Sequence, residues 1–461
     1  MTERFSAREA VALVIDTPDG FRELPAPGGE QGPDGPLSWQ GYDASRARAA
    51  ARTGEEESVV CAAATVGGTP AVLIAFEFGF LGGSLGERTG DRLEAAYTYA
   101  REHRLPVVSL VATGGSRMQE GMLALSQLQC VARQSALTRE AGLPQIAVLR
   151  DPTTGGGWAT LGAGADVTLA LPGAQVGFAG SRVRPPDADP AAYTAEAQWA
   201  AGAVDAVVGE DELRETVALW LGLLTRPSGG AAPAPYALGA TGLPATGWDA
   251  VLRARSTQHP RAQAYLDDYF TRRAALSGDR CGGTDAGMLC GFGEHTDEHG
   301  TRTVAYAAQC GTATRPAGYR TAARLIRLAG RLGIPVLTLV DTPGAANDAD
   351  AERQGVGSAI ADLFAAVATA RTPVTTLVIG EGGSGGALAL AAPGNTWATP
   401  DSYFSVIAPE LAAAILKRPA HEVRPTADQL RIRPQDLVDL GVVRGVRRHS
   451  SDGPVTSPPP P

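Results

Sequence analysis

Short runs of apolar residues, each about the length of one β-strand, recur along the chain and end at glycine-rich turns. Residues 105–111 form one such run before Gly114–Gly115, and residues 143–149 form another before Gly155–Gly157. Between these two runs, residues 121–140 have the pattern of a helix. Alternating buried strands and helices predict right-handed βαβ crossovers and therefore an α/β fold.

The second half of the chain repeats this arrangement at a constant offset. Residues 334–340 and 372–378 are again strand-like runs, and a helical segment, residues 355–369, lies between them. The prolines of the four runs are paired 229 residues apart: Pro106 with Pro335, and Pro144 with Pro373. The same offset places Gly156–Gly157 on Gly385–Gly386. Two copies of one α/β domain are the simplest explanation.

Shifts in composition divide the chain into segments. Residues 226–248 are rich in Pro, Gly and Ala, which is typical of a linker, and the chain ends with a Ser-rich stretch and four prolines. We predict an N-terminal arm (1–40), a first domain (41–225), a linker (226–250), a second domain (251–447) and a disordered tail (448–461).

Composition and charge narrow the possible functions. The 461 residues are 44% hydrophobic and 19% charged, as in soluble globular proteins, and the net charge of −9 argues against a broad nucleic-acid-binding face. The apolar runs are too short to span a bilayer and the first residues lack a signal-peptide pattern, so we expect a cytoplasmic protein. The five cysteines include no Cys-x-x-Cys pair, so we predict no zinc ribbon, no bound metal and a reducing compartment.

The glycine-rich turns are the best candidates for chemistry. Such a turn at the start of a helix leaves backbone N–H groups unpaired, and the helix dipole strengthens their attraction for a negative oxygen. Two turns could therefore stabilise two oxyanions, although glycines also permit a helix to pack closely on a strand. The lysine of a Walker loop is absent, and the match to a dinucleotide-binding fold is weak.

Conventional acid–base catalysis has little support in the sequence. The six histidines all lie outside the glycine turns, and a surface position is the simpler interpretation for each of them. Chemistry in which a substrate or cofactor supplies the base would account for this pattern.

Longer motifs surround the turns in both halves. Those of the first half are residues 76–86, 114–120, 151–156 and 177–183. Those of the second half are residues 278–280, 318–320, 341–345, 352–355, 380–387 and 403–410. From about residue 40 to residue 446, the chain resembles the carboxyltransferase component of acetyl-CoA carboxylase, a crotonase-superfamily enzyme, with a β-subunit-like first half and an α-subunit-like second half. The resemblance implies two tandem crotonase-like (ClpP/crotonase) ββα-superhelix domains.

The chain departs from the family pattern in three places. The zinc ribbon of the β subunit is missing, and the basic insertion before Gly318 is shortened to residues 310–316. Residues 345–348 also differ from the family's usual sequence. The missing ribbon agrees with the cysteine pattern, and the shortened insertion bears on where phosphates bind. The change at residues 345–348 bears on the specificity for the acyl group or for biotin.

The resemblance implies a separate task for each glycine turn. Carboxybiotin, carried on another protein, would bind the second half, where the N–H groups of Gly385 and Gly386 hold its ureido oxygen and favour release of CO₂. The biotin anion would then take the α-proton of an acyl-CoA. The N–H groups of Gly155 and Gly156 would hold the thioester enolate oxygen until the enolate captures CO₂.

Binding roles follow from the same resemblance. The acyl-CoA pocket is expected to be shaped by Gly82, Gly83, Gly114, Gly115 and Arg117. Contacts with the biotin side or with a dimer interface are expected from Gly318, Tyr319 and Arg320. The alternative for each residue is a structural role, in turn geometry or in a surface ion pair.

The expected partners also come from the resemblance. They are an acyl-CoA, a biotin carboxyl carrier protein, a biotin carboxylase and further copies of this chain, because the family's site forms between two protomers. The family's default product is malonyl-CoA, for fatty acid or polyketide biosynthesis. Two alternatives stay open at this point: a biotin-independent decarboxylase of malonyl thioesters, and a catalytically degenerate scaffold subunit of a carboxylase.

Overall fold

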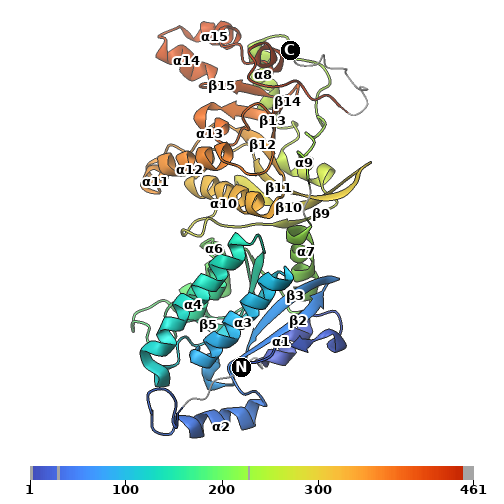
Figure 1. The fold of residues 1–461 in the computed structure, drawn as a ribbon. Helices are drawn as coiled ribbons and strands as arrows, with labels where there is room; N and C mark the ends of the chain where they lie inside the picture. The colour runs from blue at the N-terminus through green and yellow to red at the C-terminus, as the bar shows by residue number, and fades with distance from the viewer. Residues whose placement is uncertain (1–3, 28–31, 227–228, 450–461) are drawn as a thin grey trace. The chain divides into compact units, whose positions relative to one another are not determined.

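The computed structural model describes residues 4–27, 32–226 and 229–449, and the chain forms two compact units (Figure 1). Unit 1 comprises Met1–Arg226 with Ser277–Gly283, and unit 2 comprises Pro227–Leu276 with Thr284–Pro461. Apart from Arg448 and His449, the predicted disordered tail lies outside the described residues.

Unit 1 is built on a twisted sheet in the order β1-β2-β3-β4-β5-β6-β8, with β7 paired to the end of β5. The strands are β1 (Arg22–Glu23), β2 (Val59–Val66), β3 (Thr69–Phe76), β4 (Val107–Thr113), β5 (Gln145–Thr154), β6 (Val167–Ala170), β7 (Val176–Gly177) and β8 (Ala206–Val207). Strands β2 and β3 form an antiparallel hairpin, and β3 to β6 run parallel. Buried on both faces, β4 is an almost continuous apolar run.

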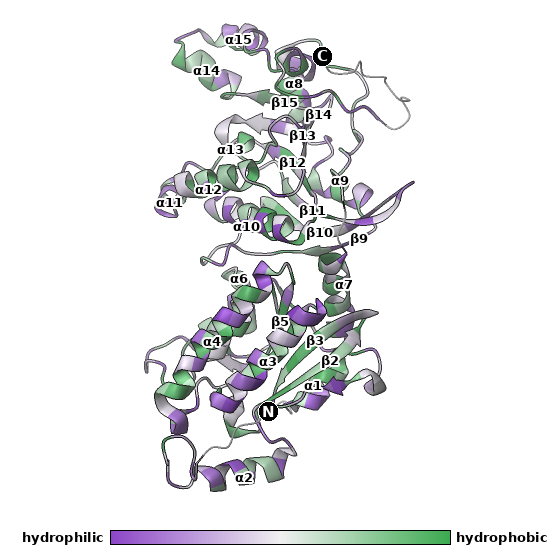
Figure 2. Cartoon of the chain, viewed as in Figure 1, coloured by the Kyte–Doolittle hydropathy of each residue, from purple (hydrophilic) through white to green (hydrophobic). Residues whose placement is uncertain are grey.

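Helices cover the sheet of unit 1. They are α1 (Ala7–Val14), α2 (Tyr42–Thr53), α3 (Glu87–His103), α4 (Gly121–Glu140), α5 (Gly155–Gly157), α6 (Ala195–Ala200) and α7 (Leu213–Thr225). Polar and apolar residues alternate along α3 and α4, which pack against each other (Figure 2). Helix α1 begins with a capping box between Ser6 and Glu9 and buries Val11 and Val14.

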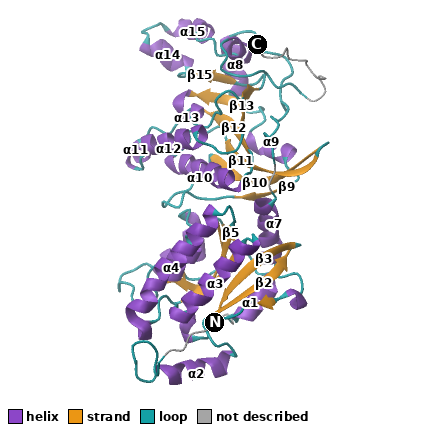
Figure 3. Cartoon of the chain, viewed as in Figure 1, coloured by secondary structure: helices purple, strands orange, loops and turns teal. Residues whose placement is uncertain are grey.

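Unit 2 repeats this plan with a sheet in the order β14-β13-β12-β11-β10-β9, and β15 pairs with the end of β13 (Figure 3). The strands are β9 (Arg272–Ala275), β10 (Met288–Asp297), β11 (Gly300–Gln309), β12 (Val336–Thr342), β13 (Val374–Gly383), β14 (Thr396–Ala398) and β15 (Tyr403–Ser405). The helices are α8 (Gly247–Ala254), α9 (Ala262–Tyr269), α10 (Pro316–Leu332), α11 (Ala349–Arg353), α12 (Val356–Ala368), α13 (Ser384–Leu388), α14 (Pro409–Ile415), α15 (Val423–Gln429) and α16 (Pro434–Asp439).

The internal repeat is visible in the backbone. The bounds of α3, β4 and β5 all become those of α10, β12 and β13 when 229 is added. Even the register shift agrees: the β4–β5 ladder is interrupted between Val111 and Thr113, and the β12–β13 ladder between Val340 and Thr342. The predicted α/β fold with two similar domains is therefore confirmed.

Candidate active site

Each glycine turn lies where a central strand passes directly into a short helix. In unit 1, α5 begins at Gly155, and in unit 2, α13 begins at Ser384. These two positions are equivalent under the offset of 229, and both have left-handed backbone, with φ of +63° and +58°. The left-handed region costs a non-glycine residue about 1–2 kcal/mol, so the Ser384 backbone is strained where the Gly155 backbone is not.

The N–H groups of the unit 1 turn are not equally available. The Gly155 N–H donates to the carbonyl oxygen of Phe178, 3.0 Å away, so the predicted role of Gly155 as an oxyanion donor has to be corrected. The N–H groups of Gly156 and Gly157 follow in the first helical turn, where no acceptor exists within the helix. The candidate donors in unit 1 are therefore Gly156 and Gly157, a pair that includes one residue the sequence analysis missed.

The two glycines of the unit 2 turn face different surroundings. A side chain added at Gly385 would meet open space, and Gly385 is exposed. A Cβ at Gly386 would lie 2.5 Å from the Ala345 nitrogen and 2.6 Å from the Tyr319 hydroxyl oxygen. Gly385 thus leaves room for a ligand beside the helix start, whereas Gly386 allows the helix to pack closely on the neighbouring loop.

A second loop supports the turn in unit 1. The loop after β3, which contains Gly82, is joined to the loop after β4 by backbone hydrogen bonds: Gly114 N–H to Gly82 O (2.9 Å), Leu85 N–H to Gly115 O (2.9 Å) and Arg117 N–H to Leu85 O (2.8 Å). A Cβ at Gly155 would lie 3.1 Å from the Gly115 Cα, so the joined loops press against the start of α5. We refer to residues 82–85 and 114–117 as the loop pair.

Unit 2 forms the same loop pair from different residues. Thr314 N–H donates to Gly344 O at 3.1 Å, and Ala346 N–H donates to Thr314 O at 2.9 Å. These are the equivalents of the Leu85 and Arg117 bonds under the offset of 229. The residue that corresponds to Arg117 is therefore Ala346.

Of the residues predicted to shape an acyl-CoA pocket, four are backbone elements of the loop pair. Gly82, Gly83 and Gly115 have positive φ values of +69°, +61° and +111°, which the tight loops require. Gly114 is exposed beside them.

The fifth residue, Arg117, does not face a pocket. Its side chain is 1% exposed, and it forms ion pairs with Glu57 and Glu120, which are 1% and 0% exposed. Burial acts to lower the pKa of Arg117, but Glu57 and Tyr42 outweigh it and raise that pKa. The predicted pocket contact is wrong for this side chain, and so is the alternative of a surface ion pair, because the cluster is buried.

The residues predicted to contact biotin or a dimer partner lie on α10. Gly318 and Tyr319 are both buried. The Tyr319 hydroxyl lies next to Gly386 of α13, whereas Gly318 packs against Asp285 and Met288. Arg320 is half-buried and donates to the Gln354 carbonyl oxygen at 3.0 Å.

A charged network that the sequence analysis missed holds the unit 2 turn. The Arg255 guanidinium donates to Glu381 at 2.8 Å and to Glu410 at 2.5 Å, and the Tyr403 hydroxyl donates to Glu381 at 2.7 Å. Burial, followed by the Glu381 carboxylate, raises the pKa of Tyr403, which keeps its hydroxyl a donor. Glu381 belongs to β13, only a few residues before Ser384, so this network links the turn to α8, β15 and α14.

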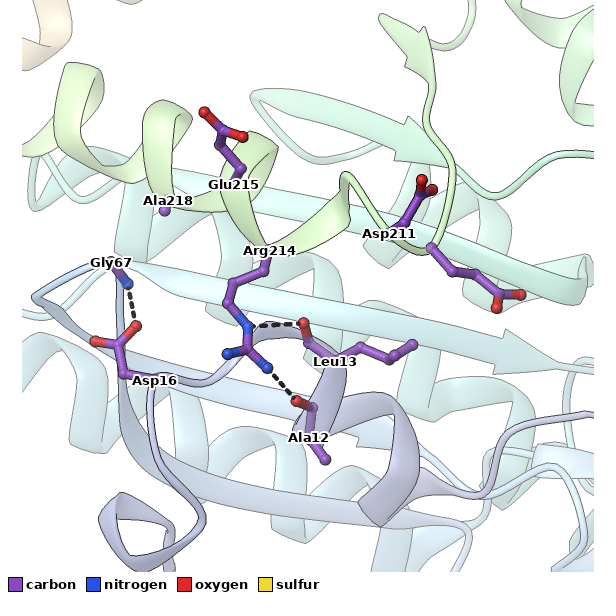
Figure 4. Close-up of a pocket in the computed structure, with 9 residues that line it drawn as sticks. Ala12, Leu13, Asp16, Gly67, Asp211, Arg214, Glu215 and Ala218 are labelled. Carbon is purple, nitrogen blue, oxygen red and sulfur yellow. Dashed lines mark hydrogen bonds between the residues drawn. The ribbon is translucent and has the colours of Figure 1, made fainter.

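A pocket of about 500 Å³ in unit 1 involves none of the glycine turns (Figure 4). It is lined by Ala12, Leu13, Asp16, Gly67, Glu210, Asp211, Arg214, Glu215 and Ala218. Arg214 donates to the carbonyl oxygens of Ala12 (2.9 Å) and Leu13 (3.3 Å), so it caps the C-terminus of α1. This arginine is therefore already engaged in helix capping.

Residues 4–27, 32–226 and 229–449 contain neither a candidate membrane-spanning helix nor a candidate metal-binding cluster. Within them, no helix combines the length and apolar character needed to cross a membrane. Within the same ranges, the histidine, cysteine, aspartate and glutamate side chains do not gather in groups of three or more that could hold a metal ion.

Comparisons with known proteins cover both halves of the chain. A family described as "Carboxyl transferase domain" matches residues 36–213, and one described as "Acetyl co-enzyme A carboxylase carboxyltransferase-like" matches residues 244–455. The acetyl-coenzyme A carboxylase carboxyl transferase subunits beta/alpha of Salinispora arenicola are 38% identical over 96% of this chain and 82% of that protein. The corresponding protein of Saccharopolyspora erythraea is 40% identical over 88% of this chain and 74% of its own length.

A more distant relative and a solved structure extend the comparison. A "probable biotin-dependent acyl-coenzyme A carboxylase beta3 subunit" of Mycobacterium tuberculosis is 34% identical over 87% of this chain and 82% of its own length. The crystal structure of transcarboxylase 12S, with methylmalonyl-coenzyme A and methylmalonic acid bound, has a TM-score of 0.77 at 21% identity. It covers 96% of this chain and 86% of that one, and at this identity it supports the fold alone.

Proposed function

The chain belongs to the carboxyltransferase family of acetyl-CoA carboxylases, and on that premise we propose that it transfers a carboxyl group from carboxybiotin, borne on a separate carrier protein, to an acyl-CoA. The observation that carries the proposal is that both halves retain a glycine turn with the same backbone geometry. Each turn presents consecutive N–H groups at a helix start, so the chain offers two anion-stabilising sites.

The backbone of each turn has a defined task in this reaction. The N–H groups of Gly385 and Gly386 hold the ureido oxygen, and open space beside Gly385 fits the approach of a planar ring. The N–H groups of Gly156 and Gly157 hold the thioester enolate oxygen. Carboxybiotin supplies both the carboxyl group and the base that removes the α-proton. The protein contributes position and fixed dipoles, which agrees with the absence of histidines from the turns.

We propose a homodimer or a larger homo-oligomer. Apolar side chains are exposed near both turns: Met118, Met122, Phe178 and Val183 in unit 1, and Leu388, Val406, Leu411 and Ile415 in unit 2. Leu411 and Ile415 are one helical turn apart on α14, with 56% and 68% of their surface exposed. Large apolar exposure of this kind is typical of protein–protein interfaces.

Other partners follow from the same reaction. The chain requires a biotin carboxyl carrier protein and a biotin carboxylase as separate proteins, and we propose a cytoplasmic setting in fatty acid or polyketide biosynthesis. Malonyl-CoA is the product if acetyl-CoA is the substrate.

The direct test is a carboxyl-transfer assay on the purified chain. Carboxylated carrier protein is supplied with a panel of acyl-CoAs, and formation of the carboxylated thioester is followed. We expect transfer to at least one acyl-CoA and no release of CO₂ from malonyl-CoA alone. CO₂ release without biotin would instead indicate a decarboxylase, and failure to bind any CoA ester would indicate a scaffold subunit.

A further inference from the structure

A buried charge cluster joins the loop pair of unit 1 to the body of the domain. The Arg117 guanidinium donates to both carboxylate oxygens of Glu57, to the Tyr42 hydroxyl at 3.1 Å and to the Ser84 carbonyl oxygen at 2.7 Å. It also contacts the Ser84 Oγ at 3.2 Å. Ser84 belongs to the loop after β3, and Arg117 belongs to the loop after β4. The Arg117 side chain therefore ties the two loops together.

The cluster has a second carboxylate with its own role. Glu120 accepts the Glu87 N–H at 2.6 Å, at the start of α3, and a hydrogen bond from Tyr42. Its carboxylate is also 3.4 Å from the Arg117 guanidinium. The cluster thus links the loop pair to α2, α3 and the segment before β2.

A buried ion cluster adds little net stability to a fold. Removing charges from water costs several kcal/mol per ion, and well-packed apolar residues often replace buried ion pairs without loss of stability. Specificity of conformation is a better-supported consequence of such groups than stability.

The second half of the chain shows that the fold does not require this charge. At the position equivalent to Arg117 stands Ala346, and the equivalent backbone bonds form at 2.9 and 3.1 Å. The loop pair is therefore a property of the backbone, and the guanidinium is an addition confined to unit 1.

We infer that Arg117, held by Glu57, is a positioning residue that fixes the loop pair against the start of α5 and so aligns the Gly156 and Gly157 N–H groups with the enolate oxygen. The inference rests on the proposed carboxyl transfer. In it, Arg117 does not contact the substrate but affects the turn indirectly, through the packing of Gly115 against Gly155. Because Gly115 lies against Gly155, any drift of the loop pair changes the direction of the first N–H groups of α5.

The test uses a variant that removes the guanidinium without leaving its main partner charged. Arg117→Met combined with Glu57→Gln is compared with the wild type in the full-length chain, and Arg327→Met serves as control because its ion pair with Asp362 is exposed. We expect kcat for carboxyl transfer to fall about 10²-fold in the double variant, as for a misplacement of about 1 Å, while KM for the acyl-CoA changes little. We expect the control to match the wild type.

A second readout does not depend on activity. Hydrogen exchange of the Leu85 and Gly114 amides, which donate across the loop pair, should accelerate in the double variant. The Thr314 amide, which makes the equivalent bond in unit 2, should stay as protected as in the wild type.

The two readouts separate the possible failures. A folded double variant with wild-type kcat and wild-type exchange at Leu85 and Gly114 would overturn the positioning role. If the wild type itself transfers no carboxyl group, the proposed function fails, and the exchange rates alone then decide whether Arg117 fixes the loop pair. Loss of protection at Thr314 as well would mean global loosening and would also count against the inference.

Discussion

Alanine substitutions at the two neighbouring glycines of the unit 2 turn should have opposite effects on stability. At Gly386 a methyl group would lie 2.5 Å from the Ala345 nitrogen and 2.6 Å from the Tyr319 hydroxyl oxygen, far inside van der Waals contact. Overpacking of this kind costs about 1–3 kcal/mol. At Gly385 the methyl group meets open space and the backbone is helical, so alanine should stabilise the chain by about 0.4–1 kcal/mol.

Activity should not follow stability in this pair. In Gly385→Ala the new methyl group occupies the space beside the N–H groups, so a ligand oxygen can no longer approach them. We expect carboxyl transfer to fall about 10²–10³-fold, as for the loss of one oxyanion donor. Urea unfolding and steady-state transfer from carboxylated carrier protein measure the two effects on the same preparation. A stabilised Gly385→Ala variant with undiminished transfer would refute the assignment of this turn to the ureido oxygen.

Three further predictions concern the strained, charged and linking residues around the turns. Gly155→Ala should destabilise the chain by more than about 1 kcal/mol, because φ at this position is +63° and the new methyl group would press against Gly115. Ser384→Gly should stabilise the chain by about 1 kcal/mol, because it relieves the left-handed backbone of a non-glycine residue. Thermal unfolding of both variants measures these changes. Burial acts to raise the pKa of Glu57, but Arg117 prevails and lowers that pKa below the usual 4.5. The ionised Glu57 carboxylate therefore contributes its full stabilisation above about pH 4.5, and this stabilisation is lost as the pH falls through the lowered pKa. The difference in urea midpoint between the wild type and Glu57→Gln should therefore shrink below about pH 4.5, and a difference that grows in acid would contradict the ion pair. Arg255→Met should lower kcat for carboxyl transfer per folded molecule, because Glu381 loses its charged partner and keeps only the Tyr403 hydroxyl. A kcat per folded molecule equal to that of the wild type would assign the network to stability alone.

The sequence predicted the parts of the fold that depend on local pattern. The strands and the repeat offset could be read because β4 and β13 are apolar runs that end at glycine turns. The predicted helix at residues 121–140 coincides with α4. The N-terminal helix α1 also carries a readable signal, the capping box of Ser6 and Glu9, which the analysis of hydrophobic runs did not use.

The site could be predicted only as far as its chemistry lies in the backbone. The turns were found because glycine is the signal for such a backbone, but the hydrogen bond from Gly155 to Phe178 joins segments that the sequence does not place together. Arg117 was misassigned for the same reason: Glu57 and Tyr42 are 60 and 75 residues away, and only tertiary packing turns this arginine inward.

The two halves share the backbone of the glycine turn and differ in the residues around it. The loop-pair hydrogen bonds, the left-handed first helical residue and the strand register are common to both, because duplication preserved the backbone that presents the N–H groups. Side chains at equivalent positions have diverged: Gly155 against Ser384, and Arg117 against Ala346. Since backbone dipoles stabilise any suitably placed oxyanion, the shared geometry cannot tell an enolate from a ureido oxygen. The identity of the ligand at each turn is therefore set by groups outside the turn's backbone. Because Arg117 and Ala346 are both buried, exchanging this pair between the halves is expected to change the alignment of the N–H groups and not which substrate a turn accepts.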